Sequence, residues 1–175
     1  MPNDETLPAT EYTLLPKELD STHYHLHGQD ASSGGSVLVH VWHGANELQQ
    51  NLEVAWQLMR RGERIVLLET IKGLRTADAT RNGVEWEFKR LSNAKNIPRA
   101  IEKAVLQKKG QACRFVLHIM QPYSNSQLTN GLYKIVCNSA PADFQEIALL
   151  FADGRLVSLS RQEIENKNFE KLGKK

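Results

Sequence analysis

Cysteine is scarce in this chain, with two residues in 175. A single possible pair is no disulfide framework, and Cys113 and Cys137 both lie in apolar contexts, so we expect both to be buried free thiols. Apolar runs are short, because none approaches the roughly 20 residues that a bilayer-spanning helix needs. The acidic, proline-containing start lacks the positive residues and apolar stretch of a signal peptide. The sequence therefore predicts no membrane contact and a cytoplasmic site of action.

Net charge is also small, at +2, but it is distributed unevenly. Residues 1–88 carry seven basic and thirteen acidic side chains, and residues 115–175 carry seven and six. Between them, residues 89–114 carry eight basic side chains against one acid, a local charge of +7. A cationic segment of this kind favours contact with nucleic acid. Its basic residues are Lys89, Arg90, Lys95, Arg99, Lys103, Lys108, Lys109 and Arg114.

An apolar fraction of 41% is enough for a sizeable core, and the length favours one compact domain. We expect residues 1–35 to form an N-terminal arm and strand, and residues 36–165 to form an α+β domain. Residues 166–175 are expected to be a charged, frayed tail.

Hydrophobic periodicity predicts a mostly antiparallel, twisted sheet with two helices packed on it. One helix spans 46–61. The second is basic, begins with Asn96 as its cap, and has Pro98 in its first turn. Residues 122–131 are expected to be a polar loop, and 132–138 suit either a helix or a strand. The expected strands are 23–27, 36–42, 64–70, a hairpin strand within 80–89, 114–120, 146–151 and 155–160.

A β-hairpin is predicted around Asn82-Gly83, which is a strong turn signal. After the turn, Val84, Trp86 and Phe88 alternate with two glutamates and a lysine. This period of two places the apolar side chains on the core face and turns Glu85, Glu87 and Lys89 to the opposite, outer face.

The acids and the lysine of this hairpin suit nuclease chemistry by two routes. In one, Asp78 and Glu87 hold a divalent cation while Lys89 orients the attacking water, as in metal-dependent nucleases. In the other, RNA is cut without metal by its own 2′-hydroxyl. The metal-free route needs a base, for which Glu87 or a histidine is suited, and cations or donors on the phosphate: Lys89, Arg90, Arg114, Ser92 and Asn93. A solvated strand face with a Glu–Lys pair remains the structural alternative.

The histidines give weaker signals. His118 is expected either on the sheet surface that carries Lys89 or in the core. His43 stands just before a helix, where a side chain can meet an anion at the helix N-terminus. His23, His25 and His27 would share one strand face, but they lack the cysteine or acidic partners of a zinc site and suit an exposed strand better.

At the hairpin the sequence resembles a known group. GVEWEFKRL, NIPRAIEKAVLQKKGQ and RFVLHI resemble the C-terminal tRNase domains of bacterial contact-dependent growth-inhibition toxins, with related domains in phage minor head proteins. NELQQNLEVAWQLMRRGERIVLLE and QEIALLFADGRLVSLSR extend the resemblance to residues 40–162. These domains belong to the barnase–EndoU–colicin–RelE-like nuclease fold.

The resemblance implies a barnase- or RelE-like fold and metal-independent cleavage of RNA, often tRNA, with no cofactor and with a cognate immunity protein as a partner. Asp78, Glu87 and Lys89 match the family's acid–lysine hairpin, and Ser92 matches the hydroxyl residue after it. The glutamine near the end of the helix is matched by Gln107 or Gln111. This sequence departs from the pattern where Ala77 replaces the usual proline, and residues 1–39 have no counterpart.

Three hypotheses follow from the sequence. The first is a metal-independent ribonuclease acting through Lys89 with Glu87, Asp78, His43 or His118. The second is a metal-dependent DNase using Asp78, Glu87 and Lys89. The third is a non-catalytic protein that binds RNA through Arg99, Lys103, Lys108 and Lys109.

Overall fold

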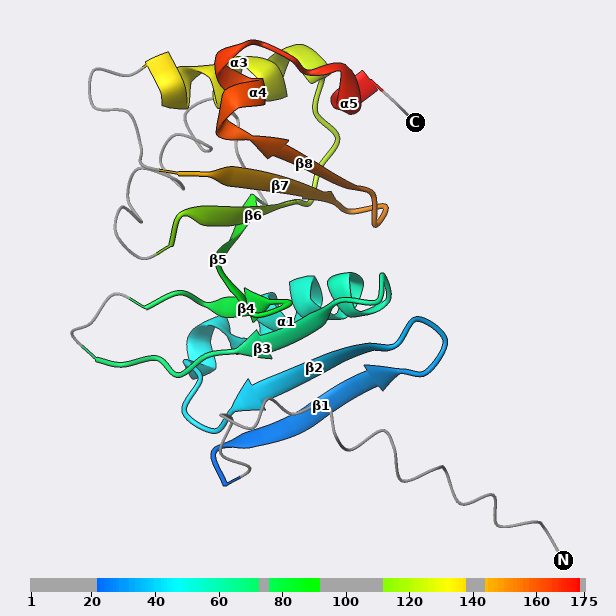
Figure 1. Cartoon of the computed structure of the whole chain (residues 1–175), viewed down its shortest axis with the longest axis vertical. Coiled ribbons are helices and arrows are strands. Elements are labelled where there is room, and N and C mark those ends of the chain that lie inside the picture. The colour runs from blue at the N-terminus through cyan, green and yellow to red at the C-terminus, as the bar shows by residue number, and fades with distance from the viewer. Residues whose placement is uncertain (1–21, 73–75, 92–111, 138–143, 174–175) are drawn as a thin grey trace, which may run out of the picture.

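The computed structural model describes residues 22–72, 76–91, 112–137 and 144–173. Eight strands form one sheet in which spatial order follows sequence order (Figure 1). Four neighbouring pairs are antiparallel and three are parallel, so the α+β class with a mostly antiparallel sheet is confirmed, while the parallel pairs were not predicted. The strands are β1 (Tyr24–Asp30), β2 (Gly35–His40), β3 (Arg64–Leu67), β4 (Ala79–Arg81), β5 (Val84–Leu91), β6 (Arg114–Ile119), β7 (Glu146–Phe151) and β8 (Leu156–Ser160).

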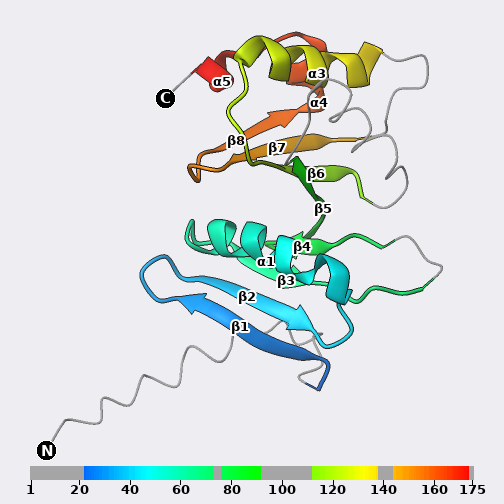
Figure 2. The same cartoon turned by 180° about the vertical axis from the view of Figure 1, so that it is seen from behind.

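Four helices lie within the described ranges, and none of them is long and apolar enough to cross a membrane. They are α1 (Ala45–Met59), α3 (Asn125–Cys137), α4 (Arg161–Glu165) and α5 (Glu170–Gly173). Helix α1 covers the half of the sheet that contains β2–β4, and the other three gather beside β6–β8 (Figure 2).

Helix α1 follows the predicted apolar spacing and buries Leu52, Ala55, Leu58 and Met59 against the sheet. It ends just before Gly62, whose φ of 83° suits glycine and reverses the chain into β3. The helix predicted over 46–61 is thereby confirmed.

The core has two parts. Leu52, Leu58 and Met59 of α1 pack with Phe88 of β5 and with Val116 of β6. A second cluster packs α3 and α4 onto β6, β7 and β8, with Leu128, Leu132, Phe144, Leu149 and Ile164 among its members. Because β6 and β7 contribute to both clusters, the two halves share one framework.

Strand β5 changes its partner along its length, and this decides the position of the site. Its first residues, through Trp86, pair antiparallel with β4, whereas Glu87–Leu91 pair parallel with β6. In Figure 1 β5 runs away from β4 and joins β6. Trp86, Glu87 and Phe88 are therefore buried one after another, and the predicted alternation fails. Val84, predicted to lie in the core, is 40% exposed.

The segment predicted as a loop over 122–131 is wrong beyond residue 124, because α3 begins at Asn125. Leu128, Leu132 and Ile135 recur at spacings of four and three and are buried against β6 and β7. The polar residues before and after Leu128, NSQ and TNG, made this segment resemble a loop in the sequence.

Two smaller expectations also fail. Cys113 and Cys137 are free thiols but both are exposed, since one lies in the bend before β6 and the other at the end of α3. The tail is not frayed over 166–173, because Leu172 of α5 is buried and Phe169 packs beside it. The predicted basic helix beginning at Asn96 lies outside the described residues.

Candidate functional site

The two acids of the hairpin meet where β4 begins and β5 leaves it. The register pairs Ala79 with Trp86, so the next antiparallel position sets Asp78 beside Glu87. The backbone oxygen of Asp78 accepts a 3.0 Å hydrogen bond from the Leu68 N–H, which ties this point to the end of β3. Asp78 Oδ2 accepts a 2.8 Å bond from the Phe88 N–H. The Asp78 carboxylate thereby accepts a hydrogen bond from the Phe88 N–H, which no longer pairs with the backbone of β4 because β5 separates from β4 after Trp86.

Asp78 is a buried carboxyl, 8% exposed, with an unusual proton affinity. Burial is the largest cause that raises its pKa to about 7, and the charge of Glu87 is the second. Glu47, in the first turn of α1, raises it further, while the Phe88 N–H and the Lys89 ammonium oppose the rise. At neutral pH this carboxyl is therefore poised between its protonated and ionised forms.

Lys89 forms an ion pair with Glu87, two residues earlier on the same face of β5, with Nζ 3.0 Å from Oε1. The Lys89 side chain keeps 24% of its surface exposed, whereas Glu87 has none exposed. The predicted outward position of Glu87 is therefore wrong. The outer face of a two-stranded hairpin would be solvated, but here β6 pairs with β5 from Glu87 onward and the surrounding structure covers that carboxylate.

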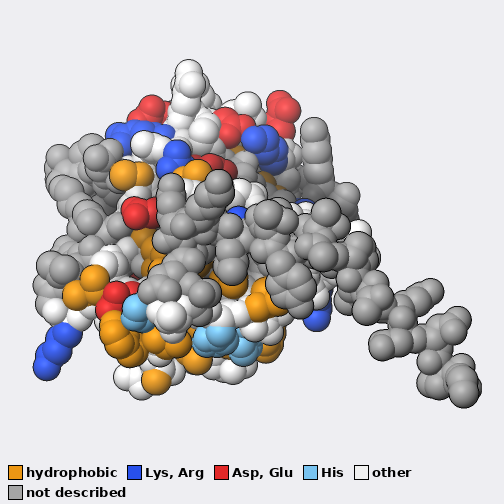
Figure 3. Space-filling view, turned by 60° about the horizontal axis from the view of Figure 1, so that its bottom comes forward, with side chains coloured by type: hydrophobic (Ala, Val, Ile, Leu, Met, Phe, Trp, Pro, Cys, Tyr) orange, Lys and Arg blue, Asp and Glu red, His pale blue; other side chains and the backbone are white. Residues whose placement is uncertain are grey.

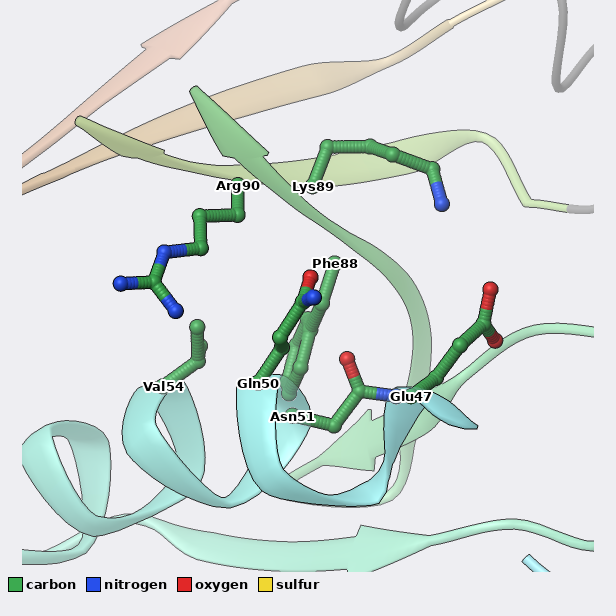
Figure 4. A pocket seen from close by; sticks show the side chains of 7 residues that line it. All are labelled: Glu47, Gln50, Asn51, Val54, Phe88, Lys89 and Arg90. Atoms are coloured by element: carbon green, nitrogen blue, oxygen red, sulfur yellow. The ribbon is translucent and has the colours of Figure 1, made fainter. Parts of the chain in front are cut away.

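A shallow pocket borders this cluster and encloses roughly 430 Å³ of space that includes open solvent. In Figure 4 the ammonium of Lys89 and the carboxylate of Glu47 lie toward one end of the pocket, and Arg90 lies at the other. Gln50 and Asn51 of α1 project between them with their amide groups. The pocket is lined by Glu47, Gln50, Asn51, Val54, Phe88, Lys89 and Arg90.

His43, which the sequence suggested as a residue that meets an anion at the start of α1, is held inside the protein by hydrogen bonds. It is 7% exposed, and both ring nitrogens are engaged. Nδ1 donates to the Leu68 carbonyl at 2.6 Å, and Nε2 accepts from Asn51 Nδ2 at 3.0 Å. Because Leu68 also holds Asp78, His43 joins the pocket helix to the loop that carries the buried acid.

His118 is separated from Lys89 by the sheet. The register places Lys89 beside Leu117 and places Arg90 beside His118, so the two predicted catalytic residues point to opposite faces. His118 is 1% exposed, its Nε2 accepts from Gln57 Nε2 at 3.1 Å, and burial lowers its pKa. It belongs to the packing beneath α1 and not to the acid–lysine cluster.

The predicted phosphate-binding cations are in part already paired. Arg90 NH1 lies 3.1 Å from Glu53 Oε2, and Arg114 Nε lies 4.0 Å from Glu146 Oε2. Neither contact is buried, so both guanidinium groups retain exposed surface. The remaining predicted substrate contacts lie outside the described residues: Ser92, Asn93, Arg99, Lys103, Gln107 and Gln111.

Sequence reasoning missed Glu47 and Asn51. Both lie on the start of α1, where Glu47 occupies the first turn and Asn51 follows one turn later. Asn51 lies on the face of α1 that buries apolar residues, and this was the available signal. A buried polar side chain requires a hydrogen-bond partner, so its position could have pointed to His43.

Metal ligation by three or more side chains is not found in the part of the chain that the structure describes. The row of His23, His25 and His27 is interrupted by a register shift in β1 between Leu26 and Gly28. His27 stacks on Trp56 at 5.7 Å between ring centroids and meets the ring of His25 edge-on at 6.2 Å.

Residues 75–156, which contain Asp78, Glu87 and Lys89, match the family model of the contact-dependent growth inhibition CdiA C-terminal domain. This match covers a little under half of the chain and shows what that part is similar to. This confirms the resemblance noted in the sequence. The matched region begins just before the buried acid and ends at the start of β8.

A solved structure with a similar chain is the CdiA-CT/CdiI toxin and immunity complex from Burkholderia pseudomallei. The two chains are 18% identical, the TM-score is 0.48, and the alignment covers 66% of this chain and 85% of that one. A comparison with curated proteins found no match.

Proposed function

We propose that this chain is a nuclease toxin that cleaves RNA, with tRNA as the expected substrate. Its catalytic residues would be Asp78, Glu87 and Lys89. The observation that supports this most is the buried Asp78, whose pKa is raised to about 7 first by its burial and then by the charge of Glu87, a second buried carboxyl. An acid with a strongly raised pKa beside a pocket is a candidate functional residue, and Lys89 and Phe88, which contact this pair, line the pocket.

The charge balance of the site favours help from a divalent cation. The charges of Glu47 and Glu87 both act on Asp78, and Lys89 is the one cation among the described groups that influence it. A phosphodiester would be repelled by this arrangement unless a cation stood between it and the acids. The sequence favoured the metal-free route, and the excess of carboxylates around Asp78 is the reason for proposing a cation here.

The donor set suits a hard cation of the magnesium type. Asp78 and Glu87 would hold it through carboxylate oxygens, and water and substrate phosphate would complete its ligands, as is usual for magnesium sites with one or two protein carboxylates. Such a cation supplies charge neutralisation at the phosphate and a more acidic water. Lys89 would orient the nucleophile from the exposed end of the cluster, and the Phe88 N–H fixes the orientation of Asp78.

Cleavage of purified tRNA in magnesium or manganese, compared with EDTA, tests the proposal. We expect fragments with metal and intact tRNA in EDTA. Asp78→Asn and Lys89→Ala should each reduce cleavage by at least about 100-fold, the usual range for loss of an acid–base group. Lys134→Ala, at an exposed lysine on α3, is the matched control and should cut normally.

The other outcomes decide between the remaining hypotheses. Full activity in EDTA would reject the need for a cation and would support the metal-free ribonuclease hypothesis. Cleavage of duplex DNA with intact tRNA would change the substrate to DNA. Salt-sensitive RNA binding with no cut under any condition would leave a binding protein and reject the nuclease.

A cognate immunity protein is the partner we propose, since the similar solved structure is titled as a complex of a toxin with an immunity protein. The expected site of action is the cytoplasm, where tRNA resides. Induction of this chain in a bacterial cytoplasm should arrest growth, and Asp78→Asn should relieve the arrest. Unimpaired growth with confirmed soluble expression would argue against a toxin acting there.

A further inference from the structure

An exposed tryptophan lies at the end of β2. Trp42 leaves 61% of its surface open, and the preceding Val41 leaves 50%. A rigid, exposed indole is unusual, because burying such a side chain is favourable and Trp is highly buried on average. Trp56 and Trp86, by contrast, are half-buried and buried.

Trp42 belongs to a cluster of four rings, which we call the ring shelf: His23, Tyr24, His40 and Trp42. The rings of His23 and His40 are stacked at 5.7 Å between centroids. Trp42 lies 5.4 Å from His23 and 5.6 Å from His40, both tilted, and Tyr24 meets His40 edge-on at 4.7 Å. Hydrophobic and histidine side chains gather on the same face in Figure 3.

The backbone holds the ring shelf in place. The Trp42 N–H donates to His40 Nδ1 at 3.2 Å, and the Val41 N–H donates to the His23 carbonyl at 2.8 Å. The Trp42 carbonyl accepts from the Thr70 N–H at 3.2 Å. The exposed indole is therefore pre-organised, which lowers the entropic cost of binding a flat partner on it.

The ring shelf lies at the same end of the sheet as the candidate active site. Trp42 is tied to Thr70, and Leu68, two residues earlier in the same segment, is tied to Asp78. Successive strands lie about 5 Å apart, and β4 and β5 are the second and third strands from β2, so the shelf lies on the order of 10–15 Å from the acids, about the span of two or three nucleotides. Both features lie at the same end of β2, β3 and β4.

We propose that Trp42 stacks an unpaired base of the nucleic-acid substrate whose backbone reaches Asp78, Glu87 and Lys89. This rests on the proposed nuclease function. Planar rings with polar edges suit a base, since every base offers a π-face to an aromatic side chain. The rings of the shelf contact one another through their faces and edges, so the contact with a base would work by stacking.

Binding of an eight-nucleotide single-stranded RNA, measured without turnover in an Asp78→Asn background, tests this inference. Trp42→Ala should weaken binding roughly 5- to 30-fold, the loss expected for one base–aromatic stack. Trp42→Phe should restore most of the affinity, and Val41→Ala should bind as the parent does. An abasic oligomer of equal length keeps the phosphates, and with it Trp42→Ala should make no difference.

Salt provides a second readout, because stacking releases no counterions and Trp42→Ala should leave the slope of log Kd against log salt unchanged. Equal affinity of the parent and Trp42→Ala, an equal loss with the abasic oligomer, or no binding of the RNA by the parent would each overturn the inference. If Trp42→Ala weakened binding to a protein partner and left RNA binding unchanged, the ring shelf would be a protein-docking surface instead. Binding by stacking without any tRNA cleavage in the wild type would keep this inference and reject the nuclease.

Discussion

At the scale of single residues, the raised pKa of Asp78 links the stability of the fold to pH. A carboxyl whose pKa lies above its usual value binds its proton more tightly in the folded state than in the unfolded one. Stability contributed by this group is therefore greatest at low pH and is lost as pH rises from about 4 to about 7. The ionised form of Asp78 is therefore destabilising above about pH 7.

We expect Asp78→Asn to stabilise the protein at pH 8 and to flatten the pH dependence of stability between pH 4 and 7. The amide oxygen can still accept from the Phe88 N–H, and the like-charge repulsion with Glu87 and Glu47 disappears. A gain of up to about 4 kcal/mol in the free energy of unfolding at pH 8 is expected from the pKa difference between 3.8 and about 7. Urea unfolding at pH 5 and pH 8 measures it. A variant that is less stable at pH 8 would refute this electrostatic account of the site.

His43 is expected to be a positioning residue. His43→Ala leaves the Leu68 carbonyl and the Asn51 amide without their partner in a buried place, which should cost about 1–3 kcal/mol of stability. Cleavage should fall through kcat with an unchanged pH profile, since the ring does not touch the acids. His25→Ala, at an exposed ring on β1, is the control. A shifted pH profile in His43→Ala would instead place the ring in the chemistry.

At the scale of elements, the position of α1 depends on how closely it approaches β2. A Cβ added at Gly35 would lie 1.9 Å from the Met59 carbonyl oxygen, a backbone atom that cannot move without shifting the helix end. A Cβ at Gly28 would meet the Met59 sulfur at 3.5 Å, an ordinary contact.

Gly35→Ala should therefore destabilise the fold by about 3 kcal/mol or more, in the range of severe packing defects, and Gly28→Ala by much less. Denaturant midpoints of the two variants provide the comparison. Because α1 carries Glu47 and Asn51, any folded Gly35→Ala protein should also lose activity. Equal midpoints for both variants would contradict the close approach.

Local elements could be predicted from the sequence, and the partner change in β5 could not. The periodicity of α1 and the Asn82-Gly83 turn depend on neighbours in sequence, so they were read correctly. The burial of Glu87 depends on pairing with β6, whose first residue lies 27 positions further along the chain. Alternation within β5 carries no information about that pairing. Asp78 and Lys89 were identified by type and spacing, but Glu47, Asn51 and the true place of His43 required the helix and the sheet to be assembled.

At the scale of the whole molecule, the two core clusters are joined by strands that serve both. Val116, Ala148 and Leu150 pack toward α1, while their neighbours Phe115, Ile147 and Leu149 pack toward α3 and α4. Strand β5 adds a second connection. Such sharing favours one cooperative unfolding transition.

All three tryptophans lie in the part from β2 to β5, whereas α3–α5 contribute helical signal from the other half. Tryptophan fluorescence and far-UV circular dichroism should therefore report the same urea midpoint. A helical signal that outlasts the fluorescence change would mean that the halves unfold separately.

The central claim is that the buried Asp78–Glu87 pair with Lys89 is a cutting site for RNA. Cleavage of tRNA in magnesium by the wild type and by Asp78→Asn, both shown to be folded by their unfolding curves, tests it most directly. The account predicts rapid fragmentation by the wild type and intact tRNA with the equally folded or more stable variant. Equal cleavage by the two proteins, or none by either, would contradict it.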